Sequence, residues 1–272
     1  MYVKLKYILF MLFLLNSFNF ASSLKLGIFP YTDPMQLIKI HNDLREHLSN
    51  ELGYEIEIYT AQDFVQYYDN TKNEFYDIVI TPPHFGAIHI KNGFVPLYRY
   101  DRLLKPVYVV KKDSSIFKVS DFKNKKIALS NQLSISSISG LVEISSNSID
   151  ISKHNLINTK THQAAVTSVI FGESDVAITT HTPINQMSGN IDMSKIRIIE
   201  GNINVPHVFT LASSRLDKDL VVKLKQALKS FEQTQKGKEF FVNTGFLGYT
   251  SITKKDLDSL VMFIAETKKF LE

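Results

Sequence analysis

Hydroxyl and imidazole side chains gather in loops that directly follow predicted strands, and one further imidazole begins a helix. The candidate ligand-binding residues are Tyr31, His84, Ser136, Ser137, Ser139, His162, Thr180 and His181. Hydroxyl groups and neutral imidazoles donate hydrogen bonds without adding a fixed positive charge. These residue types therefore suit the capture of a small anion.

The serine-rich stretch from Ser136 to Gly140 is the most informative of these loops. A helix is predicted over 137–145, and the main-chain N–H groups of its first turn have no partner within the helix. Those donors and the positive end of the helix dipole form a site for an anion. Gly140 would let a ligand approach the backbone closely. The alternative is that the serines only cap the helix.

His162 directly follows Thr161, the predicted cap of its helix. A helix start disfavours a cation, so a neutral imidazole that donates to a bound oxyanion fits this position. A charged imidazole fits it when the anion is present. For His162 and His84 alike, the alternative is a solvated surface side chain.

Catalysis and metal binding find little support in the sequence. Ser137, His162 and Asp175 make a serine triad on paper, but no serine lies in a Gly-x-Ser-x-Gly motif. There is no His-Glu-x-x-His motif and no glycine-rich nucleotide-binding motif. The chain has no cysteine, which excludes disulfides and thiolate metal sites. We therefore expect no enzyme activity, no catalytic residue, no metal ion and no cofactor.

The part of the chain that directly follows the N-terminal segment alternates strand and helix patterns. Strands are predicted over 24–29, 54–59 and 76–80, and helices from Met35 to shortly before Gly53, after Asp63, and from Pro82 onward. This β-α-β-α-β-α order is typical of a parallel sheet covered by helices.

A second α/β unit follows two apolar runs, 94–98 and 103–110, that have no helix between them. Its predicted elements are a turn at 120–122, strands over 126–129, 156–158, 175–179 and 196–199, and helices over 137–145 and 161–171. A strand over 205–212 and helices over 217–235 and 253–270 complete the pattern.

These elements predict an α/β protein of two lobes, each a mostly parallel sheet flanked by helices, joined by a two-stranded hinge near Tyr108 and Val208. Residues 24–107 and 206–272 would form the first lobe and residues 108–205 the second. Ligands of open parallel sheets bind beyond the carboxyl ends of the strands. The candidate residues follow such ends.

Residues 1–23 fit a secretory signal peptide, because two lysines precede an apolar run over 7–15 and small residues end the segment before Leu24. The alternative is an uncleaved anchor. Cleavage would lower the formal net charge from +4 to +2, which is too little to favour nucleic acid or an anionic membrane surface. The chain has no cysteine that could carry a lipid, so we expect a periplasmic protein without a lipid anchor.

Six segments in order resemble the periplasmic phosphate, phosphite and phosphonate binding proteins of ABC transporters. They are Leu26–Pro30, Tyr76–Pro82, Ser136–Gly140, Thr161–Val166, Gly172–Ala177 and Val205–Pro206, and the likeness runs from about Leu24 to Tyr249. The resemblance implies a type II periplasmic binding fold that closes on a phosphorus oxyanion. It also implies that Ser136, Ser137 and Ser139 donate to the oxyanion, that His162 contacts it, and that Tyr31 lines the cleft.

The sequence departs from the family pattern in three places. Ile138 stands where the family usually has Thr, and Phe85 stands where it often has Tyr, so two hydroxyl donors are missing. The stretches 179–182 and 202–207 contain no carboxylate. Family members that resemble aminoalkylphosphonate binders have acidic residues there, which meet the ammonium group of the ligand. A buried, unpaired ammonium is costly, which favours a ligand with a small or uncharged substituent.

The leading hypothesis is a monomeric periplasmic solute-binding protein that captures phosphate, phosphite or a simple phosphonate and delivers it to an ABC permease. The second is a sensor that presents the bound anion to the periplasmic part of a signalling kinase. The third is an enzyme on the same scaffold. None of the three involves nucleic acid.

Overall fold

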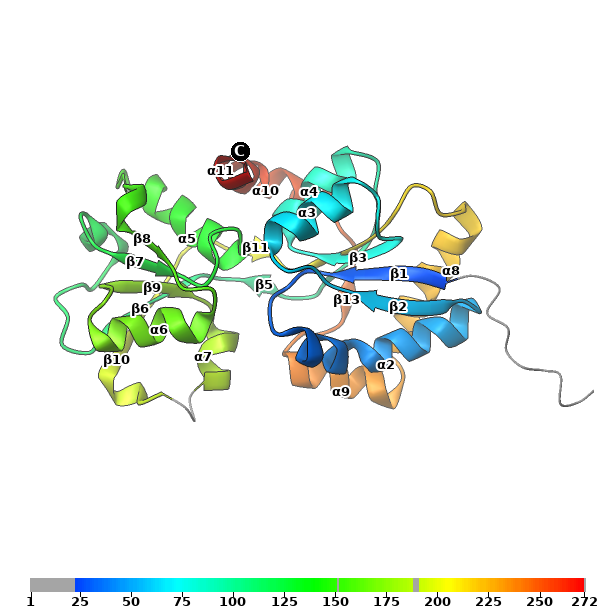
Figure 1. Cartoon of the computed structure of the whole chain (residues 1–272), viewed down its shortest axis with the longest axis horizontal. Coiled ribbons are helices and arrows are strands. Elements are labelled where there is room, and N and C mark those ends of the chain that lie inside the picture. Colours follow the sequence, from blue (N-terminus) through cyan, green and yellow to red (C-terminus); the bar gives the residue numbers. More distant parts are fainter. Residues whose placement is uncertain (1–22, 151, 188–190, 272) are drawn as a thin grey trace, which may run out of the picture.

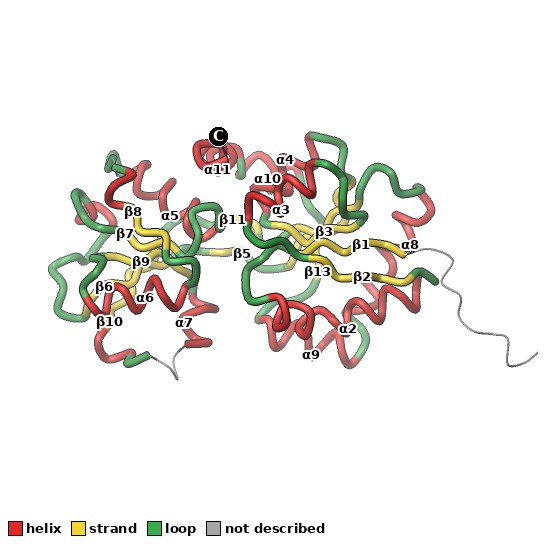
Figure 2. The backbone as a smooth tube through the Cα atoms, viewed as in Figure 1, coloured by secondary structure: helices red, strands yellow, loops and turns green. Residues whose placement is uncertain are grey.

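The computed structural model describes residues 23–150, 152–187 and 191–271. The predicted signal peptide lies outside these ranges except for Ser23. Two lobes lie side by side, each built around one mixed sheet with helices on both faces (Figures 1 and 2). The predicted two-lobe α/β architecture is confirmed. None of the helices within the described ranges is long and apolar enough to cross a membrane.

The first lobe contains a six-stranded sheet in the order β13-β4-β12-β3-β1-β2. The strands are β1 (Ser23–Ile28), β2 (Glu55–Tyr59), β3 (Ile78–Thr81), β4 (Val95–Tyr100), β12 (Phe209–Ala212) and β13 (Tyr249–Thr250). β2, β1 and β3 run parallel, whereas β12, β4 and β13 add antiparallel pairings. The sheet is therefore mixed rather than mostly parallel.

Three helices follow the three parallel strands of the first lobe, as the sequence predicts. They are α2 (Pro34–Leu52), α3 (Phe64–Lys72) and α4 (Pro83–Lys91). Asp33 caps α2 by accepting from the Gln36 amide at 2.9 Å, and Gly53 ends the helix with φ at 72°. Only glycine adopts this left-handed conformation at little cost, which explains why α2 ends there.

The second lobe contains a five-stranded sheet in the order β10-β6-β9-β7-β8. The strands are β6 (Val107–Lys111), β7 (Ile127–Leu129), β8 (Leu156–Asn158), β9 (Val176–Thr179) and β10 (Ile196–Glu200). The helical elements are η1 (Val119–Phe122), α5 (Ile135–Ser146), η2 (Lys153–Asn155), α6 (His162–Phe171), α7 (His181–Met187) and η3 (Met193–Lys195). β8, β7 and β9 are parallel, and β6 and β10 complete the sheet in antiparallel pairings.

The chain crosses between the lobes at a two-stranded sheet, in which β5 (Leu103–Leu104) pairs antiparallel with β11 (Val205–Pro206). The hinge pair therefore lies before the expected positions, because Tyr108 is already in β6 and Val208 follows β11. The predicted strands 103–110 and 205–212 are each split in two. Pro106 and Pro206 stand near the breaks, and proline has no N–H with which to continue a ladder.

The C-terminal part returns to the first lobe as α8 (Lys218–Phe231), α9 (Gln235–Thr244), β13, α10 (Lys254–Ser259) and α11 (Val261–Leu271). The single helix predicted over 217–235 and the single helix over 253–270 are each broken. Thr234 starts a new helix by accepting from the Gly237 amide at 2.9 Å. A Cβ at Gly237 would lie 1.8 Å from the Phe231 carbonyl oxygen, so this tight turn requires glycine.

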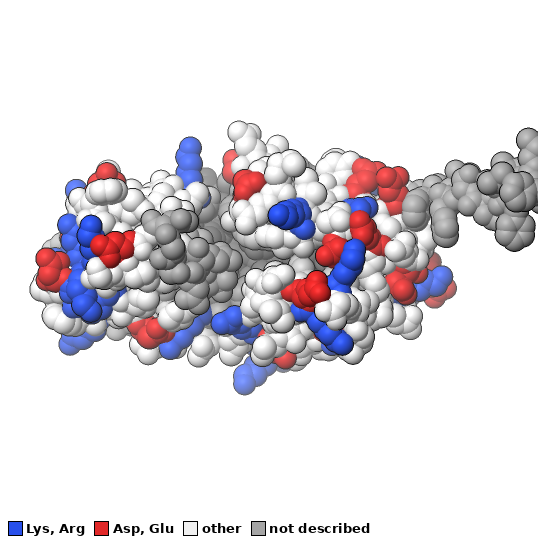
Figure 3. Space-filling view, turned by 90° about the horizontal axis from the view of Figure 1, so that it is seen from below, with Lys and Arg blue, Asp and Glu red and all other residues white. Residues whose placement is uncertain are grey.

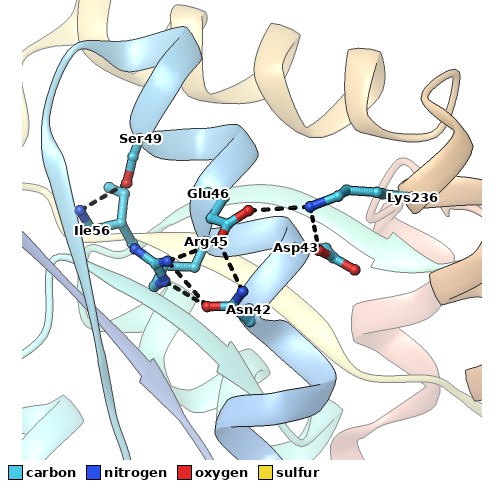
Figure 4. A network of polar contacts seen from close by, with 7 residues as sticks. All are labelled: Asn42, Asp43, Arg45, Glu46, Ser49, Ile56 and Lys236. Atoms are coloured by element: carbon cyan, nitrogen blue, oxygen red, sulfur yellow. Dashed lines mark hydrogen bonds and ion pairs between the residues drawn. The ribbon is translucent and has the colours of Figure 1, made fainter.

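α9 packs against α2 and is tied to it by a surface ion-pair network (Figure 4). The Lys236 ammonium lies 2.8 Å from Asp43 and 3.2 Å from Glu46. Exposed pairs of this kind contribute little to stability. The larger contribution comes from the apolar core, in which Phe240 and Phe241 of α9 pack with the buried leucines of α2.

Candidate functional site

The loops that carry the candidate residues lie between the two lobes (Figure 1). In the first lobe they follow the carboxyl ends of the adjacent strands β1 and β3. In the second lobe they follow the ends of β8, β7 and β9, which are also neighbours. The surface is hollowed between the lobes, and charges of both signs are scattered over both of them (Figure 3).

The helix after β7 begins two residues earlier than predicted, and its first turn is rich in serine. α5 starts at Ile135, and Ser134 is its N-cap, with the Ser134 hydroxyl accepting from the Ser137 amide at 3.2 Å. Ser136 and Ser137 are therefore the second and third residues of the helix. The amide of Ile138 bonds the Ser134 carbonyl at 2.9 Å. This leaves the Ile135 and Ser136 amides as the first-turn donors without a helical partner.

Ser134 is also the centre of a cluster of hydroxyl groups. Its oxygen lies 2.9 Å from the Ser137 hydroxyl, 3.0 Å from that of Ser136 and 3.3 Å from that of Ser130. Ser136 and Ser137 are buried, with 3% and 0% of their surface exposed. The sequence prediction missed Ser134, although a serine three residues before Ser137 is the usual signal of a helix cap.

Ser139 and Gly140 serve the helix and its packing. The Ser139 hydroxyl donates to the Ser136 carbonyl at 3.0 Å. A Cβ at Gly140 would lie 2.6 Å from the side chain of Ile178 in β9. The expectation that Gly140 lets a ligand approach is therefore wrong, because its missing side chain makes room for β9.

His84 connects the first lobe to the serine turn. It lies in the first turn of α4 and is fully buried, and its Nε2 is 3.1 Å from the carbonyl oxygen of Leu133, which directly precedes Ser134. Burial lowers the pKa of His84 to about 3, even though this backbone contact raises it. The ring is therefore neutral at pH 7, and the solvated-surface alternative is wrong for His84.

His162 is the first residue of α6, where Thr161 caps the helix by accepting from the Ala164 amide at 3.0 Å. The His162 Nδ1 lies 2.8 Å from the hydroxyl of Thr179, a buried residue at the end of β9. Loss of hydration lowers the pKa of His162 to about 4, so this ring is also neutral at pH 7. After Ser134, Thr179 is the second residue of this site that the sequence did not reveal.

Thr180 directly precedes α7 and His181 is its first residue, where a loop was expected. The Thr180 carbonyl accepts from the Ile184 amide. His181 Nε2 lies 2.8 Å from a carboxylate oxygen of Glu200, and Lys105 lies 3.9 Å from the same carboxylate. A carboxylate thus stands just before the stretch 202–207, but it is already engaged by two partners.

Tyr31 lies on the first lobe after β1, with 41% of its surface exposed. Its ring packs 5.0 Å from Phe29 and 6.2 Å from His41, measured between centroids. These partners belong to the first lobe, so Tyr31 is held at its edge rather than against the serine turn.

The two apolar departures from the family pattern share one environment. Ile138 and Phe85 are both fully buried and belong to the same apolar cluster, together with Leu133 and Ile135 of the second lobe and Phe209 of the first. The C-terminal helix α11 packs against both α4 and α5 at this place. The missing hydroxyl donors are thus replaced by apolar contact between the lobes.

A hollow of about 280 Å³ lies at the carboxyl ends of β7 and β8, beneath the last turn of α11. Leu129 and Gln132 line it on the side of the serine loop, and Lys269 and Phe270 line it on the side of the helix. The loop that leads to Ser134 therefore borders an opening.

The arrangement offers many hydrogen-bond donors and little fixed charge. The start of α5 carries the serine hydroxyls and lies next to the neutral imidazole of His84, the start of α6 carries that of His162, and His181 faces a carboxylate. Such groups can hold an anion through oriented dipoles, which are effective where water is excluded.

Comparison with solved structures supports this fold. A Xanthomonas citri protein bound to a chloride ion superposes with a TM-score of 0.78 at 17% identity, covering 91% of this chain and 98% of that one. PhnD1 from Prochlorococcus marinus in complex with methylphosphonate gives a TM-score of 0.77 at 15% identity, with coverage of 91% and 98%. A binding-protein component of a phosphonate ABC transporter from Pseudomonas aeruginosa gives 0.73 at 14%, with coverage of 92% and 89%.

The match to a family model identifies the family of this chain, whereas the structural likeness shows its fold. A search of curated protein sequences finds no match. The family model described as "ABC transporter, phosphonate, periplasmic substrate-binding protein" matches residues 26–257, which is most of the chain. This chain therefore belongs to the family of periplasmic substrate-binding proteins of phosphonate ABC transporters.

Proposed function

We propose that this protein captures a small phosphorus oxyanion, namely phosphate, phosphite or a simple phosphonate, between its lobes and delivers it to an ABC permease. The observation that carries the proposal is the first turn of α5, which combines two amides without a helical partner with the Ser134 hydroxyl cluster and whose apolar side chains pack against the other lobe. Membership of the phosphonate-binding family supports the same ligand class.

The donors have distinct roles in this proposal. The Ile135 and Ser136 amides and the hydroxyls of Ser136 and Ser137 bind oxygen atoms of the anion. His162 donates from Nε2 when the Thr179 hydroxyl donates to its Nδ1. Tyr31, Ser139, Thr180 and His181 border the ligand without forming its main contacts, because their recorded contacts are made elsewhere.

A ligand with a small or uncharged substituent fits best. The carboxylates beside these loops already have partners: that of Glu200 is shared by His181 and Lys105, and that of Glu143 accepts from Tyr108 and Asn202. An ammonium would have to displace one of these partners, and an unpaired buried charge is costly.

We also propose that the chain is exported as a monomer through a signal peptide comprising residues 1–23, and that the lobe boundaries lie near residues 107 and 206. Mass spectrometry of the exported protein should give a mature N-terminus at Leu24. A mass that includes the first 23 residues would instead indicate an anchor.

Isothermal titration calorimetry tests the ligand claim. Phosphate, phosphite or methylphosphonate should give saturable binding at one site. Ser137→Ala and His162→Ala should each weaken it about ten- to a hundredfold, since each removes a hydrogen bond to a charged group.

Two substitutions serve as matched controls for this titration. Ser145→Ala makes the same change at the exposed far end of α5, and His154→Ala removes an exposed histidine of the same lobe. Both should bind like the parent protein. Unchanged affinity in Ser137→Ala and His162→Ala would show that the site lies elsewhere.

A further inference from the structure

The C-terminal helix α11 is anchored to the first lobe where it begins. It follows α10, whose Asp256 carboxylate lies 3.2 Å from the Arg99 side chain of β4 in the first-lobe sheet. Leu260 at the junction of the two helices and Phe263 in the first turn of α11 are 0% and 2% exposed. Both belong to the apolar cluster that contains Phe85 of α4. The beginning of α11 therefore has a fixed place on the first lobe.

The last turn of α11 lies on the second lobe. Phe270 packs against the apolar core built around β6, β7 and β9, and within the described part of the chain it is the only residue from outside the second lobe to do so. Its ring also packs against the cluster that the two lobes share. Because α11 contacts both α4 and α5, it forms a third connection between the lobes, and it lies between them in Figure 1.

This third connection differs in kind from the two crossings at the hinge. The segments around β5 and β11 join the lobes through the main chain, whereas α11 is held on the second lobe by side-chain packing. A rotation of one lobe against the other leaves the main-chain crossings intact. It separates α11 from α5 if the helix follows the first lobe, and from α4 if it follows the second. Either separation exposes buried apolar surface, which opposes the movement.

The ring of Phe270 is the part of the last turn that reaches the core of the second lobe. The neighbouring Lys269 pairs with Glu266 of the same helix at 2.6 Å. Beneath the turn lies the hollow of about 280 Å³, which Phe270 borders together with Leu129 and Leu156 at β7 and β8. The turn therefore rests on the second lobe through an apolar contact beside an open space.

The contact of α11 with α5 belongs to an arrangement in which the lobes touch each other. His84 of the first lobe lies 3.1 Å from the Leu133 carbonyl oxygen of the second. Ile135 and Ile138, in the first turns of α5, pack in the same shared cluster as Phe263. α11 therefore supports the helix whose beginning carries the proposed anion donors.

We propose that α11 is a strap between the lobes and that Phe270 sets the affinity for the anion without touching it. This inference rests on the proposed function. Packing of Phe270 on the second lobe favours the arrangement in which the lobes touch, and that arrangement holds the anion. When a binding-competent arrangement is less populated, the apparent dissociation constant rises in proportion.

Calorimetric titration of the full chain with phosphate, phosphite and methylphosphonate tests the strap. Phe270→Ala should raise the dissociation constant of the anion that the parent binds best by about five- to twentyfold. Its dissociation rate constant, followed by tyrosine fluorescence in a stopped-flow instrument, should rise by a similar factor because the lobes part more easily. Met262→Ala shortens a side chain of the same helix that is 52% exposed, and it should bind like the parent.

Small-angle X-ray scattering without added anion separates a strap from a direct contact with the ligand. Loss of a direct contact would weaken binding but leave the radius of gyration of the anion-free protein unchanged. The strap predicts a larger radius of gyration for anion-free Phe270→Ala than for the parent and for Met262→Ala. At saturating anion the three proteins should have equal radii.

Two further variants grade the effect. Phe270→Leu keeps an apolar side chain at this position, so its affinity and radius of gyration should lie between those of the parent and Phe270→Ala. Ending the chain at Lys268 removes the whole last turn and should have at least the effect of Phe270→Ala. A truncated chain that binds and scatters like the parent would contradict the strap.

The outcomes distinguish this inference from the function on which it rests. Parent-like affinity in Phe270→Ala, or weaker affinity with an unchanged radius of gyration, would overturn the strap while leaving oxyanion capture intact. The absence of binding by all three anions to the parent would overturn the proposed function itself. The scattering comparison of anion-free proteins would then still decide whether α11 holds the lobes together.

Discussion

Ser134 holds together the first turn of α5 through its single hydroxyl group. That oxygen accepts from the Ser137 amide and lies within hydrogen-bond distance of three other serine hydroxyls. A group with this many partners sets both the start of the helix and the directions in which the neighbouring hydroxyls point. The site therefore depends on a residue that does not itself need to touch the ligand.

Ser134→Ala should lower the free energy of unfolding by about 1–2 kcal/mol, since the helix loses its cap and the remaining hydroxyls lose their common partner. Urea denaturation measures this difference. Ser145→Ala, at the exposed end of the same helix, should change stability by less than about 0.5 kcal/mol. Equal stabilities of the two variants would contradict the role given to Ser134.

The single residues show what a sequence can and cannot reveal about this site. The serine-rich helix start and the capped start at Thr161–His162 were predicted, because caps and hydroxyl runs are local patterns. The contact of His84 with Leu133 joins residues 49 positions apart. The pairing of His181 with Glu200 depends on the order of the strands. Neither leaves a local pattern in the sequence.

At the scale of elements, α5 links the candidate site to the segments that cross between the lobes. Glu143 lies in the middle of α5 and is buried. Its carboxylate accepts from the Tyr108 hydroxyl at 2.9 Å and from the Asn202 amide at 2.8 Å. These two residues follow the first crossing and precede the second. The Glu143 carboxylate therefore connects α5 to both crossing segments.

Glu143→Ala should lower the free energy of unfolding by about 2–4 kcal/mol, because hydrogen bonds to a charged group are lost and buried donors remain unpaired. Glu173→Ala removes an exposed carboxylate of the same lobe and should change it by less than about 0.5 kcal/mol. Denaturation curves of the two variants, compared with the parent, give the result. A loss as small as that of Glu173→Ala would show that the carboxylate does not hold the crossing segments.

The elements also show why their boundaries were harder to predict than their types. The β-α-β-α-β-α order was predicted because α2 and α3 begin at capping aspartates, α4 begins at two prolines, and the strands are apolar or alternating runs. The break between α8 and α9 arises from the close approach of Gly237 to Phe231, which is a tertiary contact. The short strands β5 and β11 exist only because they pair with each other across the hinge.

At the scale of the whole molecule, buried neutral histidines are a shared feature of the first lobe. Burial lowers the pKa of His84 to about 3 and those of His41 and His89 to about 4. In the unfolded chain each histidine titrates near its usual value of about 6.5. Below that pH the unfolded chain takes up protons that the folded chain refuses, so acid favours unfolding.

The stability that these histidines contribute should be fully present above about pH 6.5 and should be lost as the pH falls toward 4. Each contributes up to about 1.4 kcal/mol per pH unit in that window. Scanning calorimetry should therefore show a falling melting temperature between pH 7 and pH 4.5. His89→Met should reduce the slope, whereas the exposed His154→Met should not. A melting temperature that is constant over this range would contradict the burial of neutral rings.

The account as a whole depends on where an anion binds. The most direct measurement is a crystal structure of the chain with phosphate bound. We predict that the phosphate oxygens lie about 3 Å from the Ser136 and Ser137 donors at the start of α5, between the two lobes. A phosphate bound away from that turn, with the serine hydroxyls still paired among themselves, would contradict the account.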